Sequence, residues 1–373
     1  MGSLFYCSHG NAQHGYLTIS QLQGKEGDMY RRLSITSLIL GILCLLTFLT
    51  PKSPSAAPPT GSPLTPEWIK YNEQAETKNL PRLTYLVTCK KVTGTKKSKE
   101  PKEITDNFSL KDRMACMYVR WSNVLGSPVC TLRIYDPRGV LFKEWERTFK
   151  RKKPAWNQWF RHWIKDAPAS KLPGKWTAEI LMDGVLAARK EFVIGDTSVQ
   201  YKQISYGKNV SAVSVFPFIP EGDRGKMFDY EAPTFIAQMM SIDYPDYRVI
   251  LPSEIDNEIT VPAHVKIEDF VNDTINSKVL DDLITKHNIN LFIAGSARSK
   301  RRVQKFKKFT VEFDIFIIDG KSKAVVKQFH KTWSSIRDYK QEKDLLILHA
   351  CGSLYKTLMK KAKDDIEKIL TKK

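Results

Sequence analysis

The chain has 373 residues, a formal net charge of +19 at neutral pH, 42% hydrophobic residues and 11% aromatic residues. This composition excludes a disordered chain, and the length is enough for two domains behind a leader segment. The positive charge favours an anionic partner such as nucleic acid, anionic lipid or an acidic envelope polymer, while a solvated Lys-rich surface explains it equally well.

The apolar run Leu33–Leu49 carries no charge, follows Arg31 and Arg32, and precedes a Pro- and Ser-rich segment. This order is typical of an export signal. Its length fits a cleaved signal peptide or a retained helix that anchors the chain in a membrane, and a buried helix of a soluble protein is the third reading. We therefore expect the chain beyond about residue 58 to be periplasmic or otherwise extracytoplasmic, with Met29 as a candidate true start.

Composition divides the chain into five segments. The expected boundaries are 1–28 for an N-terminal extension or cytoplasmic tail, 29–57 for the signal peptide or anchor, 58–81 for a Pro/Ser-rich linker, 82–195 for a β-sandwich domain, and 207–373 for an α/β domain. Within the linker, Glu67–Glu76 has one short helical pattern, and the Pro-rich composition as a whole predicts an extended spacer.

Segment 82–195 shows short apolar runs with period-2 alternation, separated by turn signals such as the one at 136–139. The expected strands are Leu83–Val92, Met114–Asn123, Val129–Tyr135, Val140–Phe149, Gln158–Lys165, Trp176–Met182 and Leu186–Ile194. The inward residues are expected to be Ala115, Met117, Val119 and Trp121 on one strand and Trp176, Ala178, Ile180 and Met182 on another. Seven short strands at this spacing favour an all-β immunoglobulin-like sandwich, and 173–195 resembles the closing hairpin of bacterial envelope sandwich modules.

Segment 207–373 alternates strand and helix patterns, which predicts an α/β domain with a mixed sheet covered by helices. Expected strands are Asn209–Phe218, Tyr247–Leu251, Asn290–Gly295, about Val303–Ile318 with Phe309, Val311, Phe313, Ile315 and Ile317 inward, and Ala324–Trp333. Expected helices are Glu231–Ile242, Lys266–Ile275, Ser277–His287 with Ser277 as its N-cap, and Tyr339–Leu370 with one apolar stripe.

Three motifs in segment 207–373 resemble those of a known family. They are the strand Ala212–Phe218, the run Pro252–Asp256 after a strand, and Gly295 at the end of another strand. They are similar to the periplasmic α/β domain of the curli secretion channel CsgG, the penicillin-binding-protein activator LpoB and the N-terminal domain of TolB. The loop after Gly295 is more basic than in that group, and the chain has no clear lipidated cysteine. The resemblance implies a role in envelope assembly or secretion through partner binding, without catalysis.

Four cysteines lie beyond the leader, and no C-x-x-C motif or nearby His cluster suggests a zinc site. In an oxidising compartment we expect one disulfide among Cys89, Cys116 and Cys130, with Cys351 reduced. Buried reduced thiols are the alternative.

Two basic stretches are candidate partner-binding sites. The run 298–308 holds seven positive charges and no acid, namely Arg298, Lys300, Arg301, Arg302, Lys305, Lys307 and Lys308, with Phe306 and Phe309 between or beside them. It could hold phosphates or acidic glycans, or be a solvated hairpin entry. The second stretch combines Trp156, Trp159 and Trp163 with basic residues, which suits sugars, lipid headgroups or a protein hot spot, unless these rings pack the sandwich.

No catalytic motif, nucleotide-binding loop or cofactor fingerprint is present in the sequence, and the five His residues of the two domains are dispersed. Glu312 and Asp314 share one face of a strand and could do acid–base work, although a polar outer face explains them better. We therefore expect an exported, non-enzymatic envelope protein without a cofactor that binds a protein or polymer and could oligomerise. The alternative is a basic module for an anionic polymer, a lipid headgroup or, less favoured, nucleic acid.

Overall fold

The computed structural model describes residues 65–95, 98–150, 153–207, 209–221, 228–256, 274–301, 309–336 and 339–372. The chain divides into a unit of Met1–Pro59 and a compact unit of Thr60–Lys373, and all described residues belong to the second. The expected leader, Met29 and residues 266–273 of the helix expected at Lys266–Ile275 lie outside them. Within the described residues no helix is long and apolar enough to cross a membrane.

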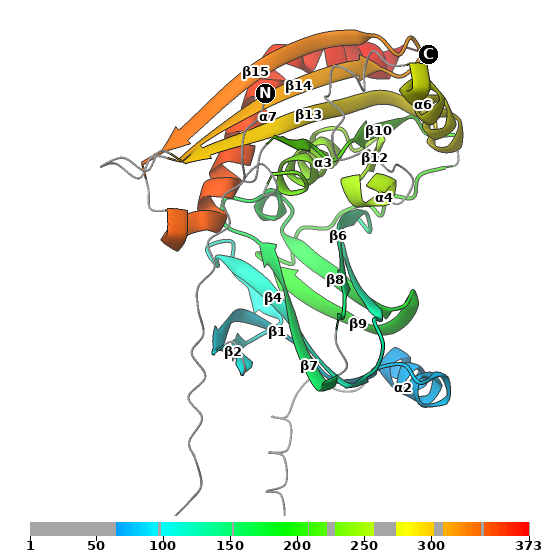
Figure 1. Ribbon diagram of the computed structural model, residues 1–373, viewed down its shortest axis with the longest axis vertical. Helices are drawn as coiled ribbons and strands as arrows, with labels where there is room; N and C mark the ends of the chain where they lie inside the picture. Colours follow the sequence, from blue (N-terminus) through cyan, green and yellow to red (C-terminus); the bar gives the residue numbers. More distant parts are fainter. Residues whose placement is uncertain are drawn as a thin grey trace, which may run out of the picture. The chain divides into compact units, whose positions relative to one another are not determined.

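Residues 82–194 form two β-sheets (Figure 1). The first has the order β2-β1-β4-β7, and the second has the order β3-β9-β8-β5-β6. The strands are β1 (Arg82–Gly94), β2 (Lys99–Ile104), β3 (Asn107–Phe108), β4 (Met114–Val124), β5 (Val129–Tyr135), β6 (Leu141–Thr148), β7 (Lys153–Trp163), β8 (Gly174–Met182) and β9 (Val185–Ile194), with a short 3-10 helix η1 (Pro168–Lys171) after β7. All pairs are antiparallel except β3 with β9.

One hydrophobic core fills the space between these two sheets. Every residue that the alternation placed inward on β4 and β8 is buried in it, Trp121 and Trp176 among the largest. Both sheets contribute alternate residues, as expected when each strand has one face toward the partner sheet. The alternation identified the residues of this core, although β4 is covered on its other face too, where Cys116 and Tyr118 belong to a separate cluster.

The second half of the expected linker is folded. Helix α2 (Pro66–Lys78) begins with Thr65 as N-cap, has Pro66 in its first turn and ends at Asn79 in the left-handed conformation. Its buried Trp68 donates from Nε1 to the carbonyl oxygen of Leu83 at 2.8 Å. The side chains of this helix that enter the sandwich core are Trp68, Tyr71 and Ala75. The helical pattern at Glu67–Glu76 is confirmed, while an extended spacer is wrong for these residues, because three apolar residues on one helix face outweigh the Pro-rich flank.

Residues 212–335 form a mixed sheet with the order β12-β10-β13-β14-β15, in which β11 also pairs with β13. Strand β10 is parallel to β12 and β13, while β14 is antiparallel to both of its neighbours. The strands are β10 (Ala212–Val215), β11 (Ile219–Glu221), β12 (Arg248–Ile250), β13 (Ile289–Arg301), β14 (Phe309–Asp319) and β15 (Val325–Ser335). Figure 1 shows the last three side by side as one long ribbon.

Helices cover both faces of this sheet. Helices α3 (Glu231–Asp243) and α7 (Tyr339–Thr371) share a core with the inward residues of β14, and the apolar stripe expected for α7 lies in it. Helices α4 (Pro252–Asp256) and α6 (Thr274–His287) share a smaller core with the opposite face. The chain is thus mostly β-structure with some helices, and it contains a mixed sheet.

Two local expectations in this half, for Gly295 and Ser277, differ from the structure. Strand β13 does not end at Gly295 but continues to Arg301; a Cβ at Gly295 would lie 2.7 Å from the carbonyl oxygen of Asp314 and 3.0 Å from the Phe218 ring, so this position has room only for glycine. Ser277 lies inside α6 and is not its N-cap. The motif at Pro252–Asp256 forms the short helix α4.

The four cysteines of the described chain are buried free thiols, so the expected disulfide is not formed. Cys89 and Cys116 are directly opposite each other on β1 and β4 and belong to a small apolar cluster. Cys130 belongs instead to the core between the two sheets. Of the three candidates, only Cys89 and Cys116 are therefore neighbours, since β4 carries Cys116 on the side opposite to its core-facing residues.

Candidate functional site

The outer face of the β13–β14–β15 ribbon, defined here as the polar residues of these strands that point away from α3 and α7, contains the first candidate site. On β14 the buried residues alternate with half-buried Thr310, Glu312 and Asp314. On β15 every second residue from Val326 to Ser334 is exposed. One side of the ribbon is therefore fixed in the core, while the other presents polar groups.

Cross-strand pairs organise this outer face. His330 on β15 lies opposite Asp314 on β14, with 2.9 Å between Nδ1 and the carboxylate, and its Nε2 lies 3.0 Å from the Thr332 hydroxyl. Glu312 lies opposite the exposed Arg298 of β13. Each carboxylate thus faces a basic group across the sheet, which supports a polar outer face over paired acid–base catalysts.

The basic run 298–308 connects β13 to β14. Arg301 and Phe309, which are paired with each other, are the last residue of β13 and the first of β14. The structure describes the exposed Arg298, whereas the side chains of Lys300 and Arg301 and the whole of residues 302–308 lie outside the described part. The candidate residues Arg302, Lys305, Lys307 and Lys308 therefore follow from sequence alone.

Phe309 is not available as a stacking platform. It is 2% exposed, belongs to the core under α7 and stacks on Phe228 with 6.2 Å between ring centroids. The Phe309 ring therefore cannot stack on a ligand of the basic run, because Phe309 is the first inward residue of β14. Phe306 lies outside the described residues.

The three candidate tryptophans of β7 face three different environments. Trp156 packs against the sandwich core with its ring centroid 5.0 Å from that of Phe149. Trp159 packs against the cysteine-containing cluster, with Lys99 Nζ 5.9 Å from its ring. Trp163 packs against the core of the α/β half. They do not form one binding surface, because side chains of a strand alternate between its faces and β7 passes from one core to another.

The structure reveals a second region that the sequence did not indicate, the seam where the β5–β6 turn and β7 meet α3 and α7. Arg138 of that turn is 5% exposed and donates to Asp136 Oδ2 at 2.6 Å and to the backbone carbonyl of Ser241 at 2.8 Å. Burial raises the pKa of the Asp136 carboxyl, and the hydrogen bonds and charge of Arg138 oppose that rise. This buried pair joins the sandwich to the C-terminal end of α3.

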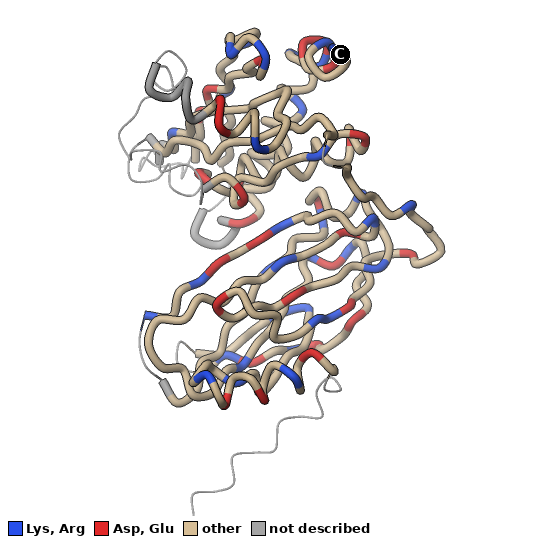
Figure 2. The backbone as a smooth tube through the Cα atoms, turned by 90° about the vertical axis from the view of Figure 1, so that its right-hand side faces the viewer, with Lys and Arg blue, Asp and Glu red and all other residues tan. Residues whose placement is uncertain are grey.

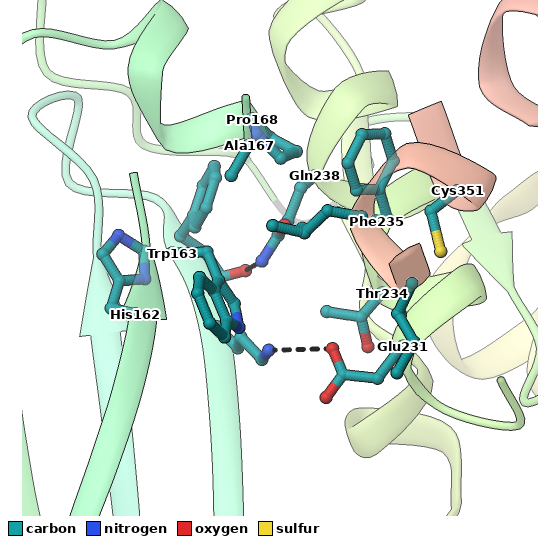
Figure 3. A pocket seen from close by; sticks show the side chains of 13 residues that line it. His162, Trp163, Ala167, Pro168, Glu231, Thr234, Phe235, Gln238 and Cys351 are labelled. Atoms are coloured by element: carbon teal, nitrogen blue, oxygen red, sulfur yellow. Dashed lines mark hydrogen bonds and ion pairs between the residues drawn. The ribbon is translucent and has the colours of Figure 1, made fainter. Parts of the chain in front are cut away.

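Further polar contacts cross the seam. The buried Gln238 of α3 donates to the carbonyl oxygen of Phe142 at 3.0 Å, and Lys143 Nζ lies 3.4 Å from Glu231. Figure 3 shows Glu231, Thr234 and Phe235 of α3 on the side facing Trp163 of β7. Lys143 also lies 4.4 Å from the Trp145 ring. These contacts and the apolar residues between them tie the two halves into one packed body.

His162 on β7 lies at the edge of the seam and is fully buried among aromatic rings. Its ring centroid is 4.9 Å from Trp176 and 5.8 Å from Phe142, and its Nε2 has no hydrogen-bond partner in the described part of the chain. Burial, together with the nearby Lys143 charge, lowers the pKa of His162 to about 3. A neutral imidazole here fills space in the core and is not poised to exchange a proton near pH 7.

A groove of about 810 Å³ lies beside the seam, between η1 and helices α3 and α7. Its lining includes apolar Phe235, Met239 and Met359, and the Asp166 carboxylate lies 3.9 Å from His349 Nε2 at the same groove. Among the described residues no group of three or more His, Cys, Asp or Glu side chains could hold a metal ion. Figure 2 shows Lys and Arg interspersed with Asp and Glu along the backbone.

The sequence matches no known protein-family profile and no curated protein. Among solved structures, the PelC dodecamer from Paraburkholderia phytofirmans shares 11% identity over 42% of this chain and 90% of PelC, with a TM-score of 0.26. Lipoprotein GNA1162 from Neisseria meningitidis shares 9% identity over 39% of this chain and 97% of its own, with a TM-score of 0.27. An immunoglobulin-like protein from Pseudomonas aeruginosa shares 15% identity over 30% of this chain and 92% of its own, with a TM-score of 0.21. Likenesses this weak carry no argument about function.

Proposed function

We propose that this chain is an exported protein of the cell envelope that binds a protein or polymer partner and catalyses no reaction. The observation that carries the proposal is the β13–β14–β15 ribbon, whose first two strands are joined by the basic run. The apolar run after Arg31 and Arg32 supports the location, because that order is typical of an export signal. Carbonate extraction distinguishes a run that is cleaved from one that is kept as a single N-terminal anchor.

The ribbon suits recognition because its inward side chains are held in the core while its outer groups stay in solvent. Val311 and Phe313 are fully buried, and each alternates with a polar residue of the outer face. Groups that are already ordered lose little conformational entropy when they meet a partner. A partner that approaches the outer face therefore meets a preorganised surface.

The finer fold assignment belongs to the same proposal. Two sheets that enclose one core, with antiparallel pairing in all pairs except one, support an immunoglobulin-like sandwich for 82–195. Parallel pairing of β10 with β12 and β13, followed by an antiparallel hairpin and a long helix, supports a CsgG- or LpoB-type domain for 207–373. That assignment would make envelope assembly or secretion the setting.

A second candidate is a basic module for an anionic polymer or lipid headgroup. The specific observation is the seven positive charges within residues 298–308. Phe309, directly after the run, is buried and cannot stack on a base. Binding through charge alone would fall steeply as salt is raised.

Location is tested with reporter fusions at Gly195, which follows β9 and precedes the linking segment to β10. We expect an alkaline phosphatase fusion, which requires export, to be active and a fusion to a fluorescent protein that matures only in the cytoplasm to be dark. The opposite pattern would refute export. Carbonate extraction of the full chain then separates an anchored chain, which stays with membranes, from a released one.

Partner binding is tested by capture from solubilised envelopes at low and high salt. The first proposal predicts a protein partner whose capture weakens but persists as salt increases, because salt screens the charge contacts and not the apolar and backbone contacts. The anionic-polymer alternative predicts capture of polymer or lipid that is lost at high salt. Equal recovery by this chain and by an unrelated basic protein at every salt concentration would contradict both.

A further inference from the structure

We propose that the outer edge of β15 accepts an extended strand of an acidic partner protein, which adds to the mixed sheet. This inference rests on the proposed function, because it names the partner's chemistry and how it is held. Strand β15 is the last strand of its sheet, and among the described residues it pairs only with β14. An edge strand presents backbone N–H and C=O groups to solvent, and these groups are a template for another strand.

This edge lacks most of the features that protect exposed edges. The opposite edge strand, β12, has only three residues, whereas β15 has 11. After a register shift between Ile317 and Ile318, the pairing continues without interruption to Ser335, and β15 contains no proline. Short length, proline, bulges and charged side chains, lysine above all, are the usual means by which proteins prevent strand addition. The regular part of β15 has only the last of these, Lys327 and Lys331, which repel a basic strand and attract an acidic one.

Exposed apolar side chains gather on the same segment. Of the nine exposed large hydrophobic residues in the described chain, three lie on β15 or directly after it. Val325 and Val326 are 37% and 39% exposed, and Ile336 is 79% exposed. Apolar groups at both ends of an open edge would be covered by an added strand of similar length, which provides a hydrophobic gain beside the backbone hydrogen bonds.

The charges on β15 select the partner. The strand contains Lys327 and Lys331 and no acidic residue, and Lys361 of α7 lies over the Phe329 ring on the helix-covered face. Asp365 of α7 lies 3.6 Å from Lys327, so one of the two strand lysines already has a partner. Two copies of β15 placed edge to edge would bring only positive charges together, which disfavours a second copy of this chain. A strand with acidic residues at alternate positions gains attraction instead.

Another long edge strand is β7, and its C-terminal end is packed against the α/β half. Arg161 forms a 2.7 Å ion pair with Asp344 of α7, and Trp163 packs against the α/β core. The seam therefore holds that end of β7, whereas no described element adds to β15. This contrast makes β15 the edge to test.

The probe is a fluorescently labelled peptide of about ten residues with alternating Val and Glu, long enough to match an ordinary strand. Its controls are the same peptide with Lys in place of Glu, and two forms that carry N-methyl groups on every second amide in either phase. N-methylation keeps the charge and removes the donors that pair strands. We expect the Val/Glu peptide to bind, the Lys form not to bind, and one methylated phase to lose at least tenfold in affinity.

The charge is tested by Lys331→Glu. This substitution should lower the affinity for the Val/Glu peptide about tenfold, because a favourable cross-strand pair becomes a repulsive one. The matched control is Lys102→Glu on β2, an exposed lysine on an edge strand of the sandwich. That control should leave affinity unchanged. Equal affinities for the two variants would overturn the assignment to β15.

The backbone is tested by Lys331→Pro and Thr332→Pro, with Lys331→Ala to account for the lost charge. Neighbouring residues of a strand direct their N–H groups to opposite sides, so one substitution removes a bond to β14 and the other a donor on the free edge. The variant that keeps the wild-type melting temperature should lose peptide binding at least tenfold. Retained binding in that variant, or full binding of both methylated peptides, would show attraction by charge alone and overturn the inference.

These outcomes are separable from those of the proposed function. If the β15 substitutions leave the peptide affinity unchanged while the envelope partner is still captured, the proposed function stands and strand addition at β15 is wrong. If the reporter fusions show that the chain is not exported while the peptide still requires the β15 edge, strand addition stands and the envelope setting is wrong.

Discussion

The seam and the β13–β14–β15 ribbon both carry charged residues, but they use them in opposite ways. At the seam, Arg138 and Asp136 are almost fully buried and hydrogen bonded to each other, and Arg138 also bonds to α3. On the ribbon, Arg298 and His330 are exposed and face carboxylates across the sheet.

The difference is one of solvation. A buried charge must keep its partner, because removing one member leaves the other without water or an opposite charge. An exposed charge keeps its water and adds little to the stability of the fold. The seam is therefore expected to hold the two halves together, and the ribbon to be free to change its partners. Four experiments test this difference between the two regions, from the largest to the smallest expected effect on stability.

Arg138→Ala should have the largest effect, lowering the free energy of unfolding by about 3–5 kcal/mol, because it leaves Asp136 buried and unpaired. Urea unfolding measures this loss. The matched control is Arg189→Ala, which removes a pair between the exposed Arg189 and the half-buried Glu179 and should cost about 1 kcal/mol, because Glu179 keeps part of its water. Asp136→Asn in the Arg138→Ala background should recover part of the loss. If Arg138→Ala and Arg189→Ala cost the same, the seam pair does not hold the halves together.

The second experiment uses pH, since the pKa of His162 is lowered to about 3 by burial. The unfolded chain binds a proton at this site below about pH 6.5 while the folded chain does not, so stability present above pH 6.5 is lost as pH falls toward 3. The expected loss at pH 4 is about 3 kcal/mol, because each pH unit below the unfolded-state value costs about 1.4 kcal/mol. His162→Phe should flatten this dependence by the same amount. A wild-type curve parallel to that of the variant would contradict a neutral buried imidazole.

Arg161→Ala tests an exposed ion pair at the seam, with Asp344 2.7 Å away and both side chains about a third exposed or more. The expected cost is about 0.2–1 kcal/mol, because water screens the pair. Thermal and urea unfolding of this variant beside Arg138→Ala separate location from burial. A cost comparable to that of Arg138→Ala would mean that any charge at the seam matters, whatever its exposure.

The smallest effect on stability is expected from replacing Arg298, Lys300, Arg301 and Arg302 together by alanine. Like charges in one run repel each other, and surface substitutions usually change stability by under about 0.5 kcal/mol each. The melting temperature should barely move, while capture of the envelope partner weakens and its salt dependence flattens. Unchanged capture at the same salt would identify the run as an ordinary solvated surface.

Elements whose burial depends on one repeating pattern could be predicted from the sequence. The inward residues of β4, β8 and β14 and the apolar stripe of α7 are all in cores, because period-2 and helical spacing fix which side chains share a face. The polar outer face around Glu312 and Asp314 follows from the same alternation. The basic run is also plain in the sequence, although its residues from 302 to 308 lie outside the described structure.

What packs against each face of a strand or helix depends on the tertiary structure. Trp156, Trp159 and Trp163 are alike in sequence, yet they meet three different clusters because β7 runs from one core to the next. Asp136 and Arg138 indicate a turn and nothing more, since their contact with α3 joins residues 103 positions apart. Burial and pairing depend on segments that are distant in sequence, and no local sequence pattern specifies which of these segments packs against a given face.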